Sequence, residues 1–189
     1  MNVLDAIVSR KSIRVYTGEQ IAEEELQAIL KAAYAAPVGM AKYDTLHLTV
    51  IQDPALLAEI DRNAAEFFNN PDAHPLYGAP TLIVVSTCEN GNVPSANVAM
   101  LVHSMALEAV ELGIGHVDIY GATAGLAMNP DLVAKLGLPE GFVPTGSIAL
   151  GKTDETYVPR EIPERIGLNR IKINEIEKLP EICRQFFAV

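Results

Sequence analysis

Cysteine is scarce in this sequence, with two residues among 189. Cys88 and Cys183 lie far apart, and neither belongs to a CxxC pair or to a Cys/His cluster with the spacing of metal ligands. We therefore predict no bound metal and two reduced thiols in the core, as is usual in the cytoplasm.

Positive charge is also sparse, since 14 Lys and Arg residues face 24 Asp and Glu residues and the formal net charge is −10. So acidic a surface is unsuited to nucleic acid, where neutralisation of phosphates by Lys and Arg supplies most of the non-specific affinity. The N-terminus lacks an apolar run behind a basic head, and the longest apolar run is shorter than the roughly 20 residues that a bilayer requires. We expect a cytoplasmic protein with no nucleic-acid or membrane partner.

Hydrophobic residues, by contrast, make up 49% of the chain. At this length that proportion is enough for one well-buried core. No stretch rich in Ser, Gly and Pro divides the sequence. We predict a single domain covering residues 1–189.

Three segments have the pattern of β-strands. Residues 45–52 alternate apolar and polar side chains, whereas residues 81–87 form a continuous apolar run behind Pro80. A further strand is predicted at residues 147–150. Together with the helices described next, these strands predict an α+β domain with a small central sheet flanked by helices.

Helical spacing is clear in two segments. One lies before Pro37, and the other covers residues 54–70 behind Asp53-Pro54, a capping residue followed by a proline suited to the first turn. The first of these helices has an apolar face made of Leu26, Ile29, Leu30 and Ala33.

A third helix, predicted at residues 97–112 and ending at Gly113, is apolar almost all round. This pattern is typical of a central helix buried on most sides. A chain of 20.4 kDa has little structure with which to cover such a helix completely. We therefore expect a second copy of the chain to cover part of it, although burial within one small core is the alternative.

The main concentration of positive charge is RKSIRVY, residues 10–16, which holds three cations and a serine within five positions. In an acidic chain this cluster is typical of a site for an anion, and phosphate is the first candidate. Arg10 and Lys11 are predicted in the last turn of a helix, and the alternative is that they interact only with its dipole and terminal carbonyls.

The helix that would precede this cluster is short. Asn2 can cap its N-terminus. Its predicted apolar stripe consists of Leu4, Ile7 and Val8.

The order of residue types in residues 10–16 (Arg, a basic residue, Ser, an apolar residue, Arg and an aromatic) resembles the opening motif of the nitroreductase family of flavoproteins. The resemblance implies an FMN site in which Arg10 and Ser12 bind the phosphate and ribityl chain, with Lys11 between them. It places Arg14 beside the flavin ring, where a positive charge would stabilise the anionic reduced flavin.

The resemblance extends along the chain and implies three further groups of FMN-binding residues. A second loop begins at Ala36-Pro37, and a third contact follows the central helix, where a glycine allows close approach of the backbone. A distal basic residue completes the phosphate site, and of the two candidates the Arg is preferred. The implied residues are Pro37, Val38, Gly39 and Met40; Ile119, Tyr120 and Gly121; and Lys152 and Arg160.

The sequence departs from the family in one place. Where many members carry Asn-x-Gln-Pro-Trp, this chain has AKYDT at residues 41–45. The departure leaves the substrate open.

The function implied by the resemblance is that of an oxidoreductase with FMN as the reactive group. Hydride would pass from NADH or NADPH through flavin N5 to a nitroaromatic, a quinone or a related acceptor by a ping-pong mechanism, with no catalytic acid or base from the chain. The family's intimate homodimer implies FMN at the subunit interface and a C-terminal extension, residues 166–189, that reaches the partner. The alternatives are a non-catalytic flavin-binding module for storage or sensing, and a dehalogenase or flavin-fragmenting relative on the same fold. Residues 67–77 are expected to cover the pocket.

Neither the one phosphate-loop match nor the histidines indicate a further site. Residues 146–153 match the phosphate-loop pattern GxxxxGK[ST], but the match contains an apolar strand and prolines follow where a helix should begin, so we interpret it as coincidence. Among the histidines, His47 and His103 are predicted to be structural, and His74 and His116 to lie beside loops. No histidine pair has the helical spacing of metal ligands.

Overall fold

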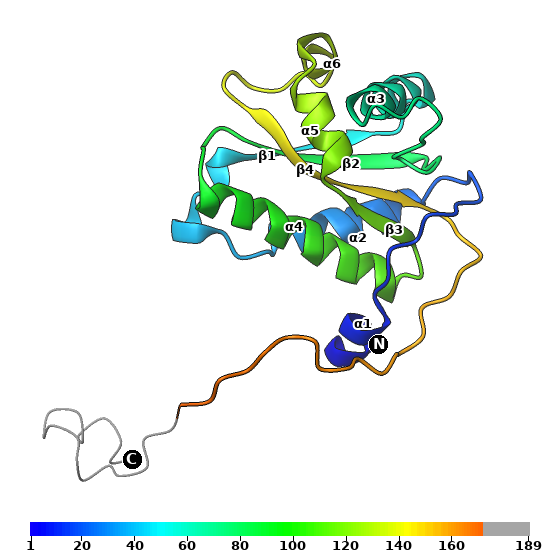
Figure 1. Ribbon diagram of the computed structural model, residues 1–189, viewed down its shortest axis with the longest axis vertical. Helices are drawn as coiled ribbons and strands as arrows, with labels where there is room; N and C mark the ends of the chain where they lie inside the picture. Colours follow the sequence, from blue (N-terminus) through cyan, green and yellow to red (C-terminus); the bar gives the residue numbers. More distant parts are fainter. Residues whose placement is uncertain (172–189) are drawn as a thin grey trace, which may run out of the picture.

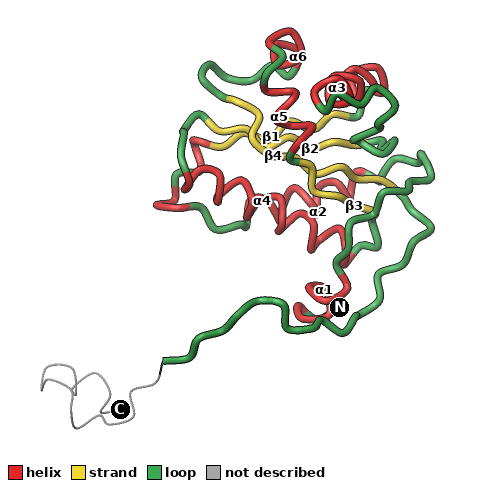
Figure 2. Tube along the Cα trace, in the orientation of Figure 1, coloured by secondary structure: helices red, strands yellow, loops and turns green. Residues whose placement is uncertain are grey.

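A computed structural model describes residues 1–171, which fold into three layers (Figure 1). The middle layer is an antiparallel sheet of four strands in the order β1-β2-β4-β3. One face is covered by α2 and α4, and the other by α3, α5 and α6, as Figure 2 also shows. The α+β prediction is therefore confirmed.

The bounds of the elements follow the chain. The strands are β1 (Leu46–Ile51), β2 (Thr81–Thr87), β3 (Gly115–Ile119) and β4 (Val143–Gly151). The α-helices are α1 (Val3–Ser9), α2 (Glu23–Tyr34), α3 (Pro54–Phe67), α4 (Asn92–Glu111), α5 (Gly121–Ala127) and α6 (Pro130–Lys135), and two short 3₁₀ helices cover Gly39–Ala41 and Tyr43–Thr45.

The continuous apolar sequence of β2 is explained by its place in the middle of the sheet. Every residue of the strand is buried. Because side chains alternate between the two faces, Ile83 and Val85 pack with α2 and α4, while Leu82 and Val84 pack with α3 and α5. The two cores therefore share one strand.

The predicted helices and strands are present with shifted ends. The central helix α4 begins at Asn92, five residues before the predicted start. Pro94 lies in its first turn, where a backbone N–H would have no acceptor within the helix, so proline is tolerated there. Asp53 caps α3 as predicted, accepting a hydrogen bond of 2.7 Å from the Leu56 amide. The first six residues of the phosphate-loop match, residues 146–151, belong to β4, which pairs with strands on both sides.

Two predictions for the N-terminal helix are wrong. Asn2 caps α1 as expected, but the helix ends at Ser9, so that Arg10 is its C-cap and Lys11 lies beyond it. The residues that α1 buries are Ala6 and Ser9. Leu4 and Ile7 of the predicted apolar stripe are exposed.

The central helix α4 buries one face in the chain and exposes the other. Val93 and Met100 on the outer face are 54% and 50% exposed. Among residues 1–171, α4 is the one helix long and apolar enough to cross a membrane, yet half of that stretch is buried inside the chain. Its packing against β2, β3 and β4 is that of a core helix.

Cys88 and the described start of the C-terminal extension are both exposed. Cys88 is exposed at the end of β2, so its prediction as a core thiol is wrong. Cys183 lies outside the described residues, as does most of the extension predicted to reach a partner. Within the described part of that extension, Ile166 and Leu168 are exposed.

Candidate functional site

The basic segment at residues 10–16 leaves α1 and runs between β3 and the residues that follow β4. The Ile13 amide donates a hydrogen bond of 2.8 Å to the His116 carbonyl of β3, and the Ile13 side chain is fully buried. On the other side, the Thr153 hydroxyl donates to the Val15 carbonyl at 2.9 Å. Hydrogen bonds on both sides therefore fix the backbone of this segment, and with it the positions from which its charged side chains extend.

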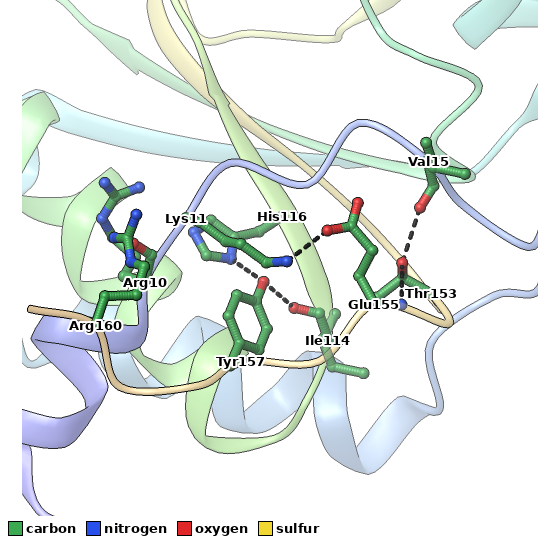
Figure 3. Close-up of polar contacts among 9 residues, drawn as sticks. All are labelled: Arg10, Lys11, Val15, Ile114, His116, Thr153, Glu155, Tyr157 and Arg160. Atoms are coloured by element: carbon green, nitrogen blue, oxygen red, sulfur yellow. Dashed lines mark hydrogen bonds and ion pairs between the residues drawn. The ribbon is translucent and has the colours of Figure 1, made fainter.

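Arg10 and Arg160 lie beside each other at the end of α1 (Figure 3). Arg160 donates from Nε to the Val8 carbonyl at 3.1 Å and from Nη2 to the Arg10 carbonyl at 2.5 Å. Neither arginine makes an ion pair with any carboxylate among residues 1–171. The Arg160 guanidinium therefore contacts the backbone of Arg10, and two cations at one helix end without a carboxylate partner favour binding of an anion.

The two lysines of the predicted phosphate site are engaged elsewhere. Lys11 Nζ lies 2.5 Å from a carboxylate oxygen of Glu155. Lys152 Nζ lies 2.6 and 2.7 Å from the two carboxylate oxygens of Glu25 on α2. As a second cation for the anion, the geometry therefore favours Arg160 over Lys152.

Three titratable groups of neighbouring elements lie close enough to feel the charge of Arg10. Burial, and to a smaller extent the positive charge of Arg10, together lower the pKa of His116 to about 4. Asp118 on β3 is exposed, yet desolvation by the surrounding protein raises the pKa of its carboxyl, an effect that Arg10 opposes. The third group is the Tyr157 hydroxyl, whose pKa is raised mainly by burial.

Asp118 and Tyr157 were missed at the level of sequence. Asp118 is the one acidic residue of β3, and its place between the apolar Val117 and Ile119 could have indicated that it lies on the other face of the strand. Tyr157 is 41 positions from the histidine that it contacts, and no local pattern marks it.

The third predicted group follows the same strand. Ile119, Tyr120 and Gly121 lie where β3 passes into α5. Ile119 is three residues beyond His116, the residue paired with Ile13, which corresponds to about 10 Å along an extended strand. A Cβ on Gly121 would collide with the ring of Phe68, so the close packing here requires glycine.

The second predicted group, Pro37 to Met40, forms a tight turn at the N-terminal end of α4. The Gly39 amide donates to Asn97 Oδ1 at 2.9 Å, and a Cβ on Gly39 would lie 2.9 Å from Val93 Cγ1. Met40 and Ala41 both have φ of 55°, in the left-handed region that non-glycine residues rarely adopt. Such strain is often found at ligand sites.

Within one chain, the first and second groups lie at opposite ends of α4. The turn at residues 37–40 packs beside Val93, in the first turn of the helix. At the other end, the N-terminal ammonium of Met1, at the start of α1, pairs with Glu111 at 2.6 Å. A helix of 20 residues is about 30 Å long. One ligand therefore cannot contact both groups of the same chain.

Arg14 lines a cavity of about 1210 Å³ between α3 and residues 71–80. Its guanidinium lies 5.6 Å from the centre of the Tyr77 ring. Tyr77 itself has φ of 56° and lines the same cavity. Part of the segment expected to cover the pocket, residues 67–77, therefore forms a cavity wall.

The histidines are distributed differently from the prediction. His116 lies within β3 and is fully buried, and His103 is exposed on α4. His74 is beside a loop as expected, where its Nδ1 lies 2.9 Å from Asp61 Oδ2. Among residues 1–171, no three His, Cys, Asp or Glu side chains gather as metal ligands would.

Comparison with known protein families identifies the family of this chain. The model of the nitroreductase family matches residues 7–152, which include the basic segment, the sheet and β4. This chain belongs to the nitroreductase family.

Relatives within the nitroreductase family cover almost the whole chain. A protein of Methanothermobacter thermautotrophicus, provisionally named NADH dehydrogenase/NAD(P)H nitroreductase, is 28% identical over 189 residues, covering 90% of this chain and 88% of the relative. A protein of Archaeoglobus fulgidus with the same provisional name is 29% identical over 177 residues, covering 89% and 95%.

Solved nitroreductase structures have the same fold. The structure of a nitroreductase from Bacteroides fragilis with bound FMN has a TM-score of 0.77 and 28% identity, and covers 91% of this chain and 100% of its own. A nitroreductase from Desulfitobacterium hafniense, also with bound FMN, has a TM-score of 0.79 at 24% identity. The latter likeness supports the fold alone.

Proposed function

We propose that this nitroreductase-family chain is an FMN-dependent oxidoreductase that takes electrons from NADH or NADPH and passes them to a nitroaromatic, a quinone or a related acceptor. The observation that carries the proposal is the pair Arg10 and Arg160, two guanidinium groups without a carboxylate partner among residues 1–171. A phosphate dianion suits such a pair because Arg10 can donate two parallel hydrogen bonds to it, and Arg160, whose Nε and Nη2 donate to carbonyls, keeps Nη1 to donate. FMN in a 28% identical relative supports this choice of ligand.

The chain's own residues would bind and orient this cofactor. Arg10, Ser12 and Arg160 would hold the phosphate, and β3 would run along the cofactor toward Ile119 and Tyr120. Arg14 would supply positive charge at the far end. When bound, FMN supplies an N5 atom that accepts hydride and later gives it up, so that donor and acceptor react in turn.

We also propose that the working form is a homodimer with FMN at the interface between the subunits. The outer face of α4 exposes Val93 and Met100, and α1 exposes Leu4 and Ile7 beside it. If two α4 helices pack antiparallel about a twofold axis, the turn at residues 37–40 of one chain comes near Arg10 of the other. This pairing would bring together the two groups that a single chain keeps apart.

Purified protein is expected to be yellow, with about one FMN per chain, and its flavin is expected to bleach when NADH or NADPH is added without oxygen. The measurement is an absorbance spectrum, followed by anaerobic titration with each nicotinamide and re-oxidation by a quinone. A colourless protein that takes up no FMN on reconstitution would contradict the proposal. Bound flavin that neither nicotinamide reduces would favour the storage or sensing module instead.

Light scattering is expected to give a mass about twice the 20.4 kDa of one chain. Met100→Asp should shift the protein to the monomer and release FMN, because it buries a charge in the proposed interface. Met128→Asp is the matched control, since Met128 is 74% exposed at the end of α5, on the opposite face of the sheet. A wild-type monomer at micromolar concentration would disprove the dimer.

A further inference from the structure

The residues after β4 form a strap, residues 152–160, that crosses the N-terminal segment and carries Arg160 to the end of α1 (Figure 3). Most of the hydrogen bonds and ion pairs that hold the strap to the rest of the chain are on the surface. The Lys11–Glu155 pair, for example, has side chains that are 34% and 42% exposed, and exposed pairs of this kind contribute little. Tyr157 makes the hydrogen bond that joins the strap to the core.

Tyr157 Oη contacts two groups of the neighbouring strand region. It lies 2.7 Å from His116 Nδ1 and 2.9 Å from the Ile114 carbonyl oxygen. The phenol has one proton, and a carbonyl can only accept, so the arrangement that makes both bonds has Tyr157 donating to Ile114 and His116 Nδ1–H donating to Tyr157. The reverse arrangement would make one bond and leave the Ile114 oxygen without a donor.

This hydrogen-bond chain fixes the histidine as the Nδ1–H tautomer. His116 is fully buried, its ring stacks on Tyr157 with centroids 5.7 Å apart, and its other nitrogen, Nε2, has no partner among the described residues. Tyr157 is therefore attached to a part of the core that cannot move with the surface loop. Arg160 follows three residues later, after Pro159, whose ring restricts the intervening backbone.

We propose that Tyr157 is the positioning residue of the anion site: by bridging His116 and the Ile114 carbonyl, it holds the strap where Arg160 stays beside Arg10. The proposal rests on the proposed function, since it takes the anion to be the phosphate of FMN. Tyr157 acts through Arg160 and does not touch the cofactor. Without this fastening, the arginine would have to be ordered on each binding event, at a cost in conformational entropy.

The test compares two flavins that differ only in the phosphate. FMN and riboflavin are titrated into flavin-free wild-type protein, Tyr157→Phe, Arg160→Ala and the double variant. Tyr157→Phe keeps the ring and removes both hydrogen bonds, so it should raise the dissociation constant of FMN by roughly three- to tenfold and leave that of riboflavin unchanged. In the Arg160→Ala background the same substitution should have no further effect.

The control and the overturning outcomes separate this inference from the proposed function. Tyr34→Phe is the matched control, because Tyr34 is 68% exposed on α2 and makes no side-chain hydrogen bond with the described residues. An equal loss of FMN and riboflavin in Tyr157→Phe, or a loss that persists without Arg160, means a merely structural role and overturns the inference alone. A wild-type chain that binds FMN no more tightly than riboflavin overturns the proposed function and the inference together.

A second measurement needs no variant. Nitrogen-15 NMR of the wild-type holoprotein reports which ring nitrogen of His116 carries the proton. A protonated Nδ1 and an unprotonated Nε2 are expected. The opposite tautomer would mean that Tyr157 donates to the histidine and does not hold the Ile114 carbonyl, which overturns the inference even if Tyr157→Phe fails to fold.

Discussion

Replacing Arg10 with alanine is expected to weaken FMN binding by about ten- to a hundredfold. Charge-assisted hydrogen bonds of the kind proposed here contribute roughly 1.5 to 3 kcal/mol, which corresponds to that range of affinity. The fold should tolerate the change, because the Arg10 side chain is half-buried and makes no hydrogen bond or ion pair with the rest of residues 1–171. Titration of FMN into the flavin-free variant, with riboflavin alongside, measures the effect.

The matched control is Arg14→Ala, since both positions belong to the same basic segment. Arg14 is exposed and stacks on Tyr77, away from the Arg10–Arg160 pair. Its loss should leave most of the FMN affinity intact and lower the two-electron reduction potential, because a positive charge that favours the reduced flavin is removed. If Arg10→Ala keeps wild-type affinity, the cations at the end of α1 serve only its terminal carbonyls, and the phosphate site must be elsewhere.

The fold could be predicted from local patterns wherever the pattern reflects burial on a defined face. The apolar face of α2, from Leu26 to Ala33, is buried as expected because one stripe of a helix meets one core. The helices α5 and α6 were not predicted. The sequence of α5, GATAGLA, has no polar stripe and two glycines, and its helical state depends on packing against α3 and β4.

The N-terminal helix shows where a local pattern misleads. Leu4 and Ile7 have the spacing of a buried stripe, yet they are exposed in the single chain. Periodicity identifies an apolar face but not the surface that covers it. If the proposed dimer forms, this face and the outer face of α4 have a common explanation.

The candidate site was predictable only in part, for a similar reason. The segment at residues 10–16 is contiguous, so its charge and residue order are visible in the sequence. The pairing of Arg10 with Arg160 joins residues 150 positions apart, and it depends on how the strap returns across the molecule. The ion pairs that occupy Lys11 and Lys152 likewise depend on Glu155 and Glu25, which no motif connects to them.

Acid is expected to destabilise the protein through His116. Burial, with smaller contributions from Arg10 and the more distant His103, lowers its pKa from 6.5 to about 4 in the folded state. Between these values the unfolded chain binds a proton that the folded chain does not, so stability falls as the pH decreases from about 6.5 toward 4. At 1.36 kcal/mol per pKa unit, the loss by pH 4 is about 3 kcal/mol. Protonation is resisted because a proton on the buried Nε2 would have no acceptor among the described residues.

Urea unfolding at several pH values between 4 and 7 measures this loss, and His116→Gln isolates it. The variant and the wild type share every other titrating group, including the Tyr157 hydroxyl, so the difference between their stabilities reports the histidine alone. His116→Gln should be less stable at pH 7, because the variant loses the close packing of the imidazole ring against Tyr157. Its free energy of unfolding should nevertheless fall about 3 kcal/mol less between pH 7 and pH 4. His103→Gln, which changes an exposed histidine of α4, should lose nearly as much stability as the wild type, because His103 makes the smallest contribution to the lowered pKa of His116. Parallel curves for the wild type and His116→Gln would mean that His116 titrates normally, and therefore that it is not held neutral between Tyr157 and Arg10.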